Sequence, residues 1–253
     1  MPNRAVSRAR GGRASRARAG RATSETPKQD RDPLLSAICH DLRAPLAAVT
    51  MGANFVLQTT RRESPEARTV QVLEAMIRSC AQMERLIKNF ADLSEIEANA
   101  VTLRLGLHDA GEILELAANA ARDAARTRSV TIEVRRPPSP LTVKSDRERI
   151  LRAVGHVLEN AVKHAPEGSA VTLAVEPRGR AVELSITDRG PGLDPELQQH
   201  LFDRQWLAAR SSRAGGFGLA IARGFVEAHG GRIDVESNAA ATTFTLVVPT
   251  EPP

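Results

Sequence analysis

Two apolar stripes at helical spacing, joined by a short turn, constrain the fold of this 253-residue chain more than any other feature. The first begins at Pro33 and continues for about 25 residues with a period near 3.5, which is typical of packed helices. The second covers 66–98, and Ser64 and Pro65 before it have the sequence of a helix start, with Ser64 as the N-cap and Pro65 at the first helical position. We therefore expect two long helices in an antiparallel hairpin. The apolar side chains of the stripes are Leu35, Ile38, Leu42, Val49, Ala53 and Val56, then Leu73, Met76, Ile77, Cys80, Met83, Ile87 and Phe90.

A single hairpin cannot cover stripes of this width. A second copy of the chain can cover them in a four-helix bundle, so we predict a homodimer formed through the helices 33–60 and 66–98. Aromatic residues make up only 3% of the chain, so its cores must be built from aliphatic side chains, which suits helix packing.

The segment 1–32 is basic and almost without large apolar residues. It holds nine Lys or Arg and three acidic residues, whereas the whole chain has a net charge of +5, so the remainder is near neutral. We expect a disordered arm, because such a segment cannot bury enough apolar surface to fold. The preferred interpretation is a solvated tail, or a start codon wrongly placed upstream, because basic runs are usually solvated. The alternatives are an arm that contacts acidic lipid, nucleic acid or a partner and, more remotely, a transit peptide. The charge does not indicate DNA binding by the folded core.

The two cysteines, Cys39 and Cys80, have no spacing typical of a disulfide framework or a zinc site, and both lie in the apolar helical stripes. We expect buried, reduced thiols. No apolar run reaches the roughly 20 residues of a membrane helix, so we expect a soluble, cytoplasmic protein.

From about residue 100 the pattern changes to alternating strands and helices. Neighbouring strands joined as in hairpins indicate an α+β sandwich rather than a doubly wound sheet. We therefore divide the chain into the arm 1–32, the helical domain 33–99 and a sandwich domain 100–250. The expected helices are Asp146–Ala165, Gly216–His229 and Asp109–Arg126, the last capped by Asp109. The segment 188–215 shows no clear period. The expected strands are Val101–Leu107, Val130–Val134, Leu141–Val143, Ala170–Glu176, Arg180–Thr187, Arg232–Glu236 and Thr242–Val248.

In the first helix, His40 falls at heptad position f, which points its imidazole into solvent. Asp41 beside it can hold the proton on one ring nitrogen and leave the other nitrogen free to attack. Pro45 cannot donate to the carbonyl of Asp41, so the helix should bend there. A single surface histidine is more often inert, and this motif alone does not exclude that alternative.

Two glycine-rich segments suit a ligand. Asp188 follows an apolar strand, where its carboxylate can accept from an exocyclic amine such as that of adenine, and Gly190 and Gly192 allow a close backbone approach. Gly216 and Gly218 open a helix whose N-terminus is a potential anion site. Read alone, each segment is explained as well by a turn or a flexible loop.

A polar cluster near the end of the helix Asp146–Ala165 suits a metal and a phosphate. Asn160 offers a neutral oxygen for Mg²⁺, which usually takes only one or two protein ligands. Lys163 lies one turn later, within reach of a phosphate. An ordinary polar cluster at a helix end is the alternative.

In this order and spacing, the motifs resemble the histidine kinase family of bacterial two-component systems, from about Pro33 to Val248. The resemblance implies that His40 is phosphorylated from Mg-ATP with Asp41 as general base, and that the phosphoryl group then passes to an aspartate of a response regulator receiver domain. It further implies that Asn160 holds Mg²⁺, that Lys163 steadies the phosphates and that His164 lies near the nucleotide. By the same resemblance, Asp188 with Gly190 and Gly192 binds adenine. Gly216 and Gly218 would cradle phosphates, and residues 194–214 would form a lid. The boxes that carry it are His40–Leu46, His156–His164, Asp188–Gly192, Leu201–Trp206 and Gly216–Gly218.

The chain departs from the family pattern at three positions. His156 stands where the family often has a further asparagine, which weakens the expected magnesium binding, and Ala214 replaces an early glycine. Ala44 lacks the polar group that positions water, so we expect weak phosphatase activity toward the regulator. We expect no sensor or receiver domain in this chain, so the signal would come from a separate sensor protein, from the arm, or not at all. A non-catalytic dimeric scaffold and a gyrase-type ATPase without phosphotransfer are the competing functions.

Overall fold

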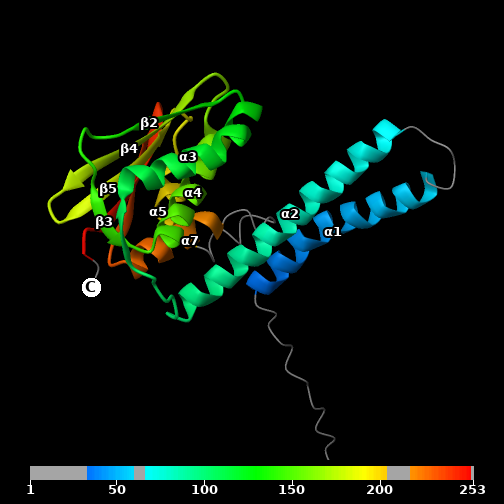
Figure 1. Ribbon diagram of the computed structural model, residues 1–253, viewed down its shortest axis with the longest axis horizontal. Helices are drawn as coiled ribbons and strands as arrows, with labels where there is room; N and C mark the ends of the chain where they lie inside the picture. The colour runs from blue at the N-terminus through cyan, green and yellow to red at the C-terminus, as the bar shows by residue number, and fades with distance from the viewer. Residues whose placement is uncertain (1–32, 60–65, 204–216, 252–253) are drawn as a thin grey trace, which may run out of the picture. The chain divides into compact units, whose positions relative to one another are not determined.

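A computed structural model describes residues 33–59, 66–203 and 217–251 of the chain. Helices α1 (Pro33–Thr59) and α2 (Glu66–Glu97) form the expected antiparallel hairpin, with α1 in blue and α2 running from cyan to green in Figure 1. Helix α1 continues through Pro45. At Gly52 the two helices approach closely, because a Cβ added there would lie 2.6 Å from Cγ of Met76. The expected cap at Ser64 and Pro65 lies outside the described residues.

The hairpin leaves several large apolar side chains exposed in the single chain. Met51 and Ile77 each have 69% of their surface exposed. Cys80 is also exposed, so the expectation of a buried thiol is wrong for Cys80 in the single chain. The reason is that no residue of the described ranges 33–59, 66–203 and 217–251 covers Cys80 on this side of α2. Further exposed large apolar side chains of the hairpin are Leu46, Val70, Leu73 and Ile87.

The second part of the chain contains a five-stranded sheet in the order β2-β4-β5-β7-β6. Strand β2 runs parallel to β4, and the other neighbours are antiparallel. The strands are β2 (Thr131–Arg135), β4 (Ala170–Arg178), β5 (Ala181–Asp188), β6 (Arg232–Asn238) and β7 (Ala241–Pro249). A separate antiparallel pair joins β1 (Gly106–Asp109) to β3 (Thr142–Ser145).

Helices α3 (Ala110–Thr127), α4 (Arg147–His164) and α7 (Phe217–Ala228) cover one face of this sheet (Figure 1). Strand β5 alternates between buried and half-buried residues, so its inward side chains meet the helices. Asp109 caps α3 by accepting from the Gly111 N–H at 2.9 Å, and Asp146 caps α4 by accepting from the Arg149 N–H at 3.1 Å. These features confirm the α+β class. Fully buried side chains at the centre include Ile113, Leu158, Leu184, Phe225 and Phe244.

One sequence expectation in this part is wrong, and one short helix was not predicted. The strand expected at Val101–Leu107 begins only at Gly106, because that is where β3 supplies a partner, Ser145 opposite Gly106. Before it, the Arg104 N–H donates to Asp146 Oδ2 at 2.8 Å. Within 188–215, where no period was evident, the structure has the short helix α5 (Pro195–His200), capped by Asp194.

A buried histidine connects α7 to the start of α4. His229 has no exposed surface, and its Nε2 accepts from the Asp146 N–H at 3.0 Å. Its Nδ1 lies 2.7 Å from the Phe225 carbonyl oxygen, to which it donates. Because an N–H points at Nε2, the ring must carry its proton on Nδ1. Burial lowers the pKa of His229, which keeps the ring neutral.

An ion cluster lies at the end of α2. Asp92 is only 3% exposed and accepts from Arg152 Nη1 at 2.7 Å and from Arg149 Nη1 at 3.1 Å. Arg149 also donates to Glu95 at 2.6 Å. Both guanidinium groups lie over the Phe225 ring, with Cζ at 4.9 and 5.6 Å from its centroid. The buried Asp92 carboxylate is therefore paired with two half-buried cations.

Candidate functional site

Three polar side chains follow one another at four-residue spacing along α4: His156, Asn160 and His164. Residues four apart on a helix lie on the same face, so these three form one stripe over about two turns. One end of this stripe meets Gly218 and the other meets the loop that begins at Asp188. Asn160 therefore lies between two of the glycine segments singled out in the sequence.

At the His164 end, Asp188 closes β5 and is only 2% exposed. Its Oδ1 accepts from the Gly190 N–H at 2.8 Å, which leaves its Oδ2 without a hydrogen bond among the described residues. Burial raises the pKa of Asp188, although the Gly190 N–H and His164 oppose this. A buried carboxylate with one uncommitted oxygen can accept from an amine such as the exocyclic amine of adenine.

The same loop packs directly against the end of α4. A Cβ added at Gly190 would lie 3.1 Å from the His164 carbonyl oxygen, so only glycine fits there without displacement. Partial burial and the charges of Lys163 and Arg128 lower the pKa of His164, while Asp188 opposes this. His164 is therefore biased toward the neutral ring beside the Asp188 carboxylate.

Gly192 has a φ of +80°, and an added Cβ would overlap the carbonyl group of Asn238, with the carbonyl carbon only 2.8 Å away. The neighbouring Leu193 N–H donates to Ser237 Oγ at 2.9 Å. We predicted that Gly190 and Gly192 let the backbone approach a ligand. In the structure both glycines let this loop approach other parts of the protein, which fixes the loop that carries Asp188.

At the other end of the stripe, the His156 ring lies against Gly218, the second residue of α7. A Cβ added at Gly218 would lie 3.0 Å from Nδ1 of His156 and 3.4 Å from its Cβ and Cγ. Burial and the charge of Arg152 lower the pKa of His156 to about 4. A neutral imidazole thus stands at the N-terminus of α7, where backbone N–H groups and the helix dipole favour an anion.

One arginine that the sequence did not single out holds the end of α4 in place. Arg128 donates to the Val162 carbonyl oxygen at 3.1 Å and to the Lys163 carbonyl oxygen at 2.7 Å. It comes from the turn between α3 and β2, far away in sequence. No local pattern marks it, because its role depends on the packing of α3 against α4.

The remaining predicted site residues are placed as follows. The Lys163 side chain is exposed at the last turn of α4, consistent with reaching a phosphate. The backbones of His40 and Asp41 lie within α1, but their side chains are outside the described residues. Gly216, Ala214 and most of the expected lid, 204–214, are also outside, whereas Gly218 is described.

Asn160 fits the proposed Mg²⁺ site by its chemistry and surroundings. Its half-buried carboxamide makes no hydrogen bond among the described residues, so its oxygen is available to a ligand. Mg²⁺ prefers oxygen ligands and keeps several waters, so one amide oxygen and substrate phosphates suffice to hold it.

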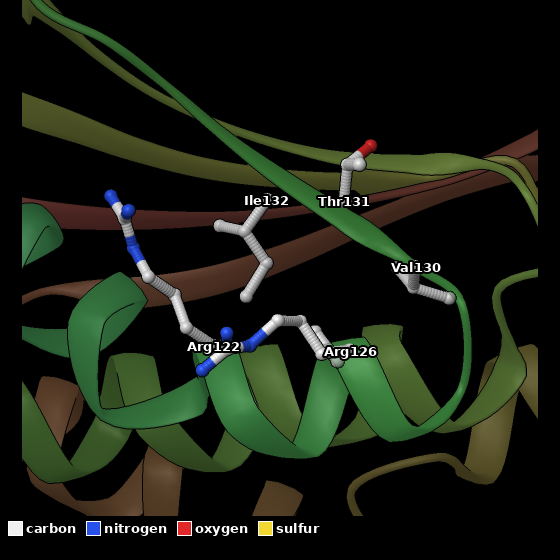
Figure 2. A pocket seen from close by; sticks show the side chains of 6 residues that line it. Arg122, Arg126, Val130, Thr131 and Ile132 are labelled. Carbon is white, nitrogen blue, oxygen red and sulfur yellow. The ribbon is translucent and has the colours of Figure 1, made fainter.

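A pocket of about 380 Å³ lies elsewhere, between α3 and β2 (Figure 2). Arg122 and Arg126 line its helical side, and Ile132 points in from the strand. None of its lining residues belongs to the α4 stripe or to the glycine segments, so it is a different surface from the candidate site.

The fold and this site define a histidine kinase-type ATPase domain that follows a helical hairpin, and comparisons with known proteins agree. Residues 30–99 match the family model of the His Kinase A (phospho-acceptor) domain. Residues 145–252 match that of the histidine kinase-, DNA gyrase B- and HSP90-like ATPase. The chain therefore belongs to the histidine kinase family of two-component systems.

The relatives agree with this assignment. Histidine protein kinase DivJ of Caulobacter vibrioides is 29% identical over 90% of this chain and 39% of its own length. Sensor histidine kinase TrcS of Mycobacterium tuberculosis is 34% identical over 83% of this chain and 42% of its own length. The chain thus spans less than half the length of these relatives.

Solved structures share the fold. Histidine kinase AdeS of Acinetobacter baumannii has a TM-score of 0.65 at 20% identity, over 83% of this chain and 98% of that one. Full-length ShkA in complex with AMPPNP has a TM-score of 0.65 at 23% identity, over 87% of this chain and 46% of that one. Histidine kinase ThkA in complex with the response regulator protein TrrA has a TM-score of 0.61 at 19% identity, over 87% of this chain and 61% of that one.

Proposed function

We propose that this chain phosphorylates its own His40 from Mg-ATP and passes the phosphoryl group to an aspartate of a response regulator receiver domain. The single observation that carries the proposal is the α4 stripe, which places Asn160 between the buried carboxylate of Asp188 and the start of α7 at Gly218. An adenine-binding end and a phosphate-binding end on either side of a metal ligand are what a bound nucleotide requires.

The chemistry assigns each group a part. A ring nitrogen of His40 attacks the γ-phosphorus, the bond to the β–γ bridging oxygen breaks, and ADP leaves. Asp41 holds the proton on the other ring nitrogen, which keeps the attacking nitrogen free. Mg²⁺ held by Asn160 would neutralise charge on the phosphate oxygens, and Lys163 would steady them. The imidazole then gives up the phosphoryl group to the carboxylate of the regulator.

The printed descriptions of two structural neighbours support the nucleotide and the partner: ShkA holds AMPPNP, and ThkA is bound to a response regulator. A cytoplasmic location is part of the proposal, because ATP and receiver domains are found there and the exposed thiol of Cys80 is free. Among the described residues, no helix is long and apolar enough to cross a membrane.

The homodimer is also part of the proposal, because the exposed apolar residues of α1 and α2 need a cover. Met51 and Ile77 lie on the two helices of the same hairpin, each with 69% of its surface exposed. We expect Ile77→Asp to convert a dimer into a monomer in analytical ultracentrifugation. Glu84→Gln, an exposed polar change on the same helix, should leave the dimer intact. A wild-type monomer at micromolar concentration would contradict the bundle.

The activity is tested by incubating the protein with γ-labelled ATP and Mg²⁺. We expect acid-labile protein label that is lost in His40→Gln and in Asn160→Ala and retained in His108→Gln, a change of a histidine outside the site. Label that survives His40→Gln would refute the phosphorylation site. Poor nucleotide binding with no label in the wild type would favour the scaffold, and ATP hydrolysis without label would favour the gyrase-type ATPase. Because Ala44 lacks a polar group, we further propose weak phosphatase activity, which rapid dephosphorylation of a cognate regulator would contradict.

A further inference from the structure

The histidine of the α4 stripe gives this site an unusual set of donor atoms. His156 and Asn160 lie one turn apart on the same face of α4, so their side chains extend over the same surface. The His156 ring lies against Gly218, at the helix N-terminus that suits the phosphates. One nitrogen donor and one oxygen donor therefore border the place where a metal-bound phosphate would lie.

Both donors are available. Neither the His156 imidazole nor the Asn160 carboxamide makes a hydrogen bond among the described residues. Burial and Arg152 lower the pKa of His156 to about 4, so the ring is neutral near pH 7 and keeps a lone pair for a metal. The positive charge of Arg152 is itself compensated by the buried carboxylate of Asp92, which reduces its repulsion of a cation.

We propose that His156 is a second metal ligand beside Asn160, and that the metal–nucleotide site therefore prefers a divalent first-row transition ion such as Mn²⁺ or Co²⁺ over Mg²⁺. The inference rests on the proposed kinase function and specifies its metal. Mg²⁺ is a hard ion that takes oxygen ligands and gains little from imidazole, whereas imidazole is a good ligand for transition metals. An asparagine at position 156 would supply an oxygen, which suits Mg²⁺.

The preference is measured by calorimetric titration of the non-hydrolysable nucleotide AMPPCP in the presence of Mg²⁺, Mn²⁺ or Co²⁺. We expect the wild-type chain to bind the Mn²⁺ and Co²⁺ complexes about tenfold more tightly than the Mg²⁺ complex. His156→Asn should reduce this ratio to near one, mainly by strengthening the Mg²⁺ complex. His108→Gln, which leaves the stripe intact, should keep the wild-type ratio.

Coordination itself is detected without any variant. In chain labelled with ¹⁵N-histidine, pulsed electron paramagnetic resonance of the Mn²⁺–AMPPCP complex should show coupling to a histidine nitrogen. The coupling should disappear in His156→Asn and persist in His108→Gln. Absence of any histidine coupling in the wild-type chain would overturn the inference even if His156→Asn fails to fold.

The outcomes separate the inference from the function on which it rests. A bound Mn²⁺–AMPPCP complex with no histidine coupling, and the same metal ratio in wild type and His156→Asn, would overturn the inference. His156 would then only pack against Gly218, and the kinase proposal would stand. Failure to bind the nucleotide with any of the three ions would overturn the kinase proposal and the metal preference together.

Discussion

Replacing Gly192 by alanine tests the loop that carries Asp188. Gly192 has a φ of +80°, which costs a residue with a Cβ about 1–2 kcal/mol. The added Cβ would also overlap the Asn238 carbonyl, whose carbon lies 2.8 Å from the Cβ position. Relief of such overpacking costs a further 1–3 kcal/mol or so. We therefore expect Gly192→Ala to lower the free energy of unfolding by roughly 2–5 kcal/mol.

The assay is urea unfolding of the full chain with two matched glycine variants. Gly179 also has a positive φ, +59°, but no described atom lies within 4 Å of its Cβ position, so Gly179→Ala should cost about 1–2 kcal/mol. Gly155 lies inside α4, again with no described atom within 4 Å, and Gly155→Ala should stabilise the chain by about 0.5–1 kcal/mol. Equal urea midpoints for Gly192→Ala and Gly179→Ala would refute the close contact with Asn238. A displaced loop should also weaken AMPPCP binding in Gly192→Ala alone.

Two further predictions concern charge. Asp92→Ala leaves Arg149 and Arg152 without their shared buried carboxylate, so it should lower the free energy of unfolding in urea by about 3–5 kcal/mol. The control Asp123→Ala removes an exposed ion pair and should stay within about 1 kcal/mol of wild type. Similar losses of stability in the two variants would contradict the burial of the cluster. The pKa of His156 falls from 6.5 in the unfolded chain to about 4 in the folded chain, so between these values the unfolded chain binds more protons and stability falls as the pH falls. Between pH 7.5 and 4.5 the wild type should lose about 2–3 kcal/mol more than His156→Asn, and parallel pH profiles would exclude a neutral, half-buried His156.

The helix starts could be predicted because their signals are local. Asp109 and Asp146 each precede a helix, and in the structure both carboxylates accept from backbone N–H groups two or three residues later. The hairpin was equally predictable, because its evidence is a period within α1 and α2. The segments that carry Asp188 and Asn160 could be predicted from their glycines and polar residues.

The features that could not be predicted from the sequence share a physical cause. Each depends on contacts with a segment that is far away along the chain. The strand expected from Val101 depended on β3, which reaches only as far as Gly106. The exposure of Cys80 depends on which face of α2 the same chain covers. Arg128 contributes through carbonyls at the end of another helix, so no neighbouring residue indicates its role.

The buried His229 also provides an internal spectroscopic reporter. Its Nδ1 proton is held by the Phe225 carbonyl oxygen, while its Nε2 accepts from the cap residue of α4. Such a proton is shielded from water and should give a separate, slowly exchanging resonance in proton NMR spectra. The two hydrogen bonds of His229 exist only while α7 and the start of α4 stay packed together. The exchange rate of the Nδ1 proton therefore reports how often these two helices separate. A bound nucleotide that stabilises the packing of α7 against α4 should slow the exchange of this proton. The exchange can be followed without any label or substitution.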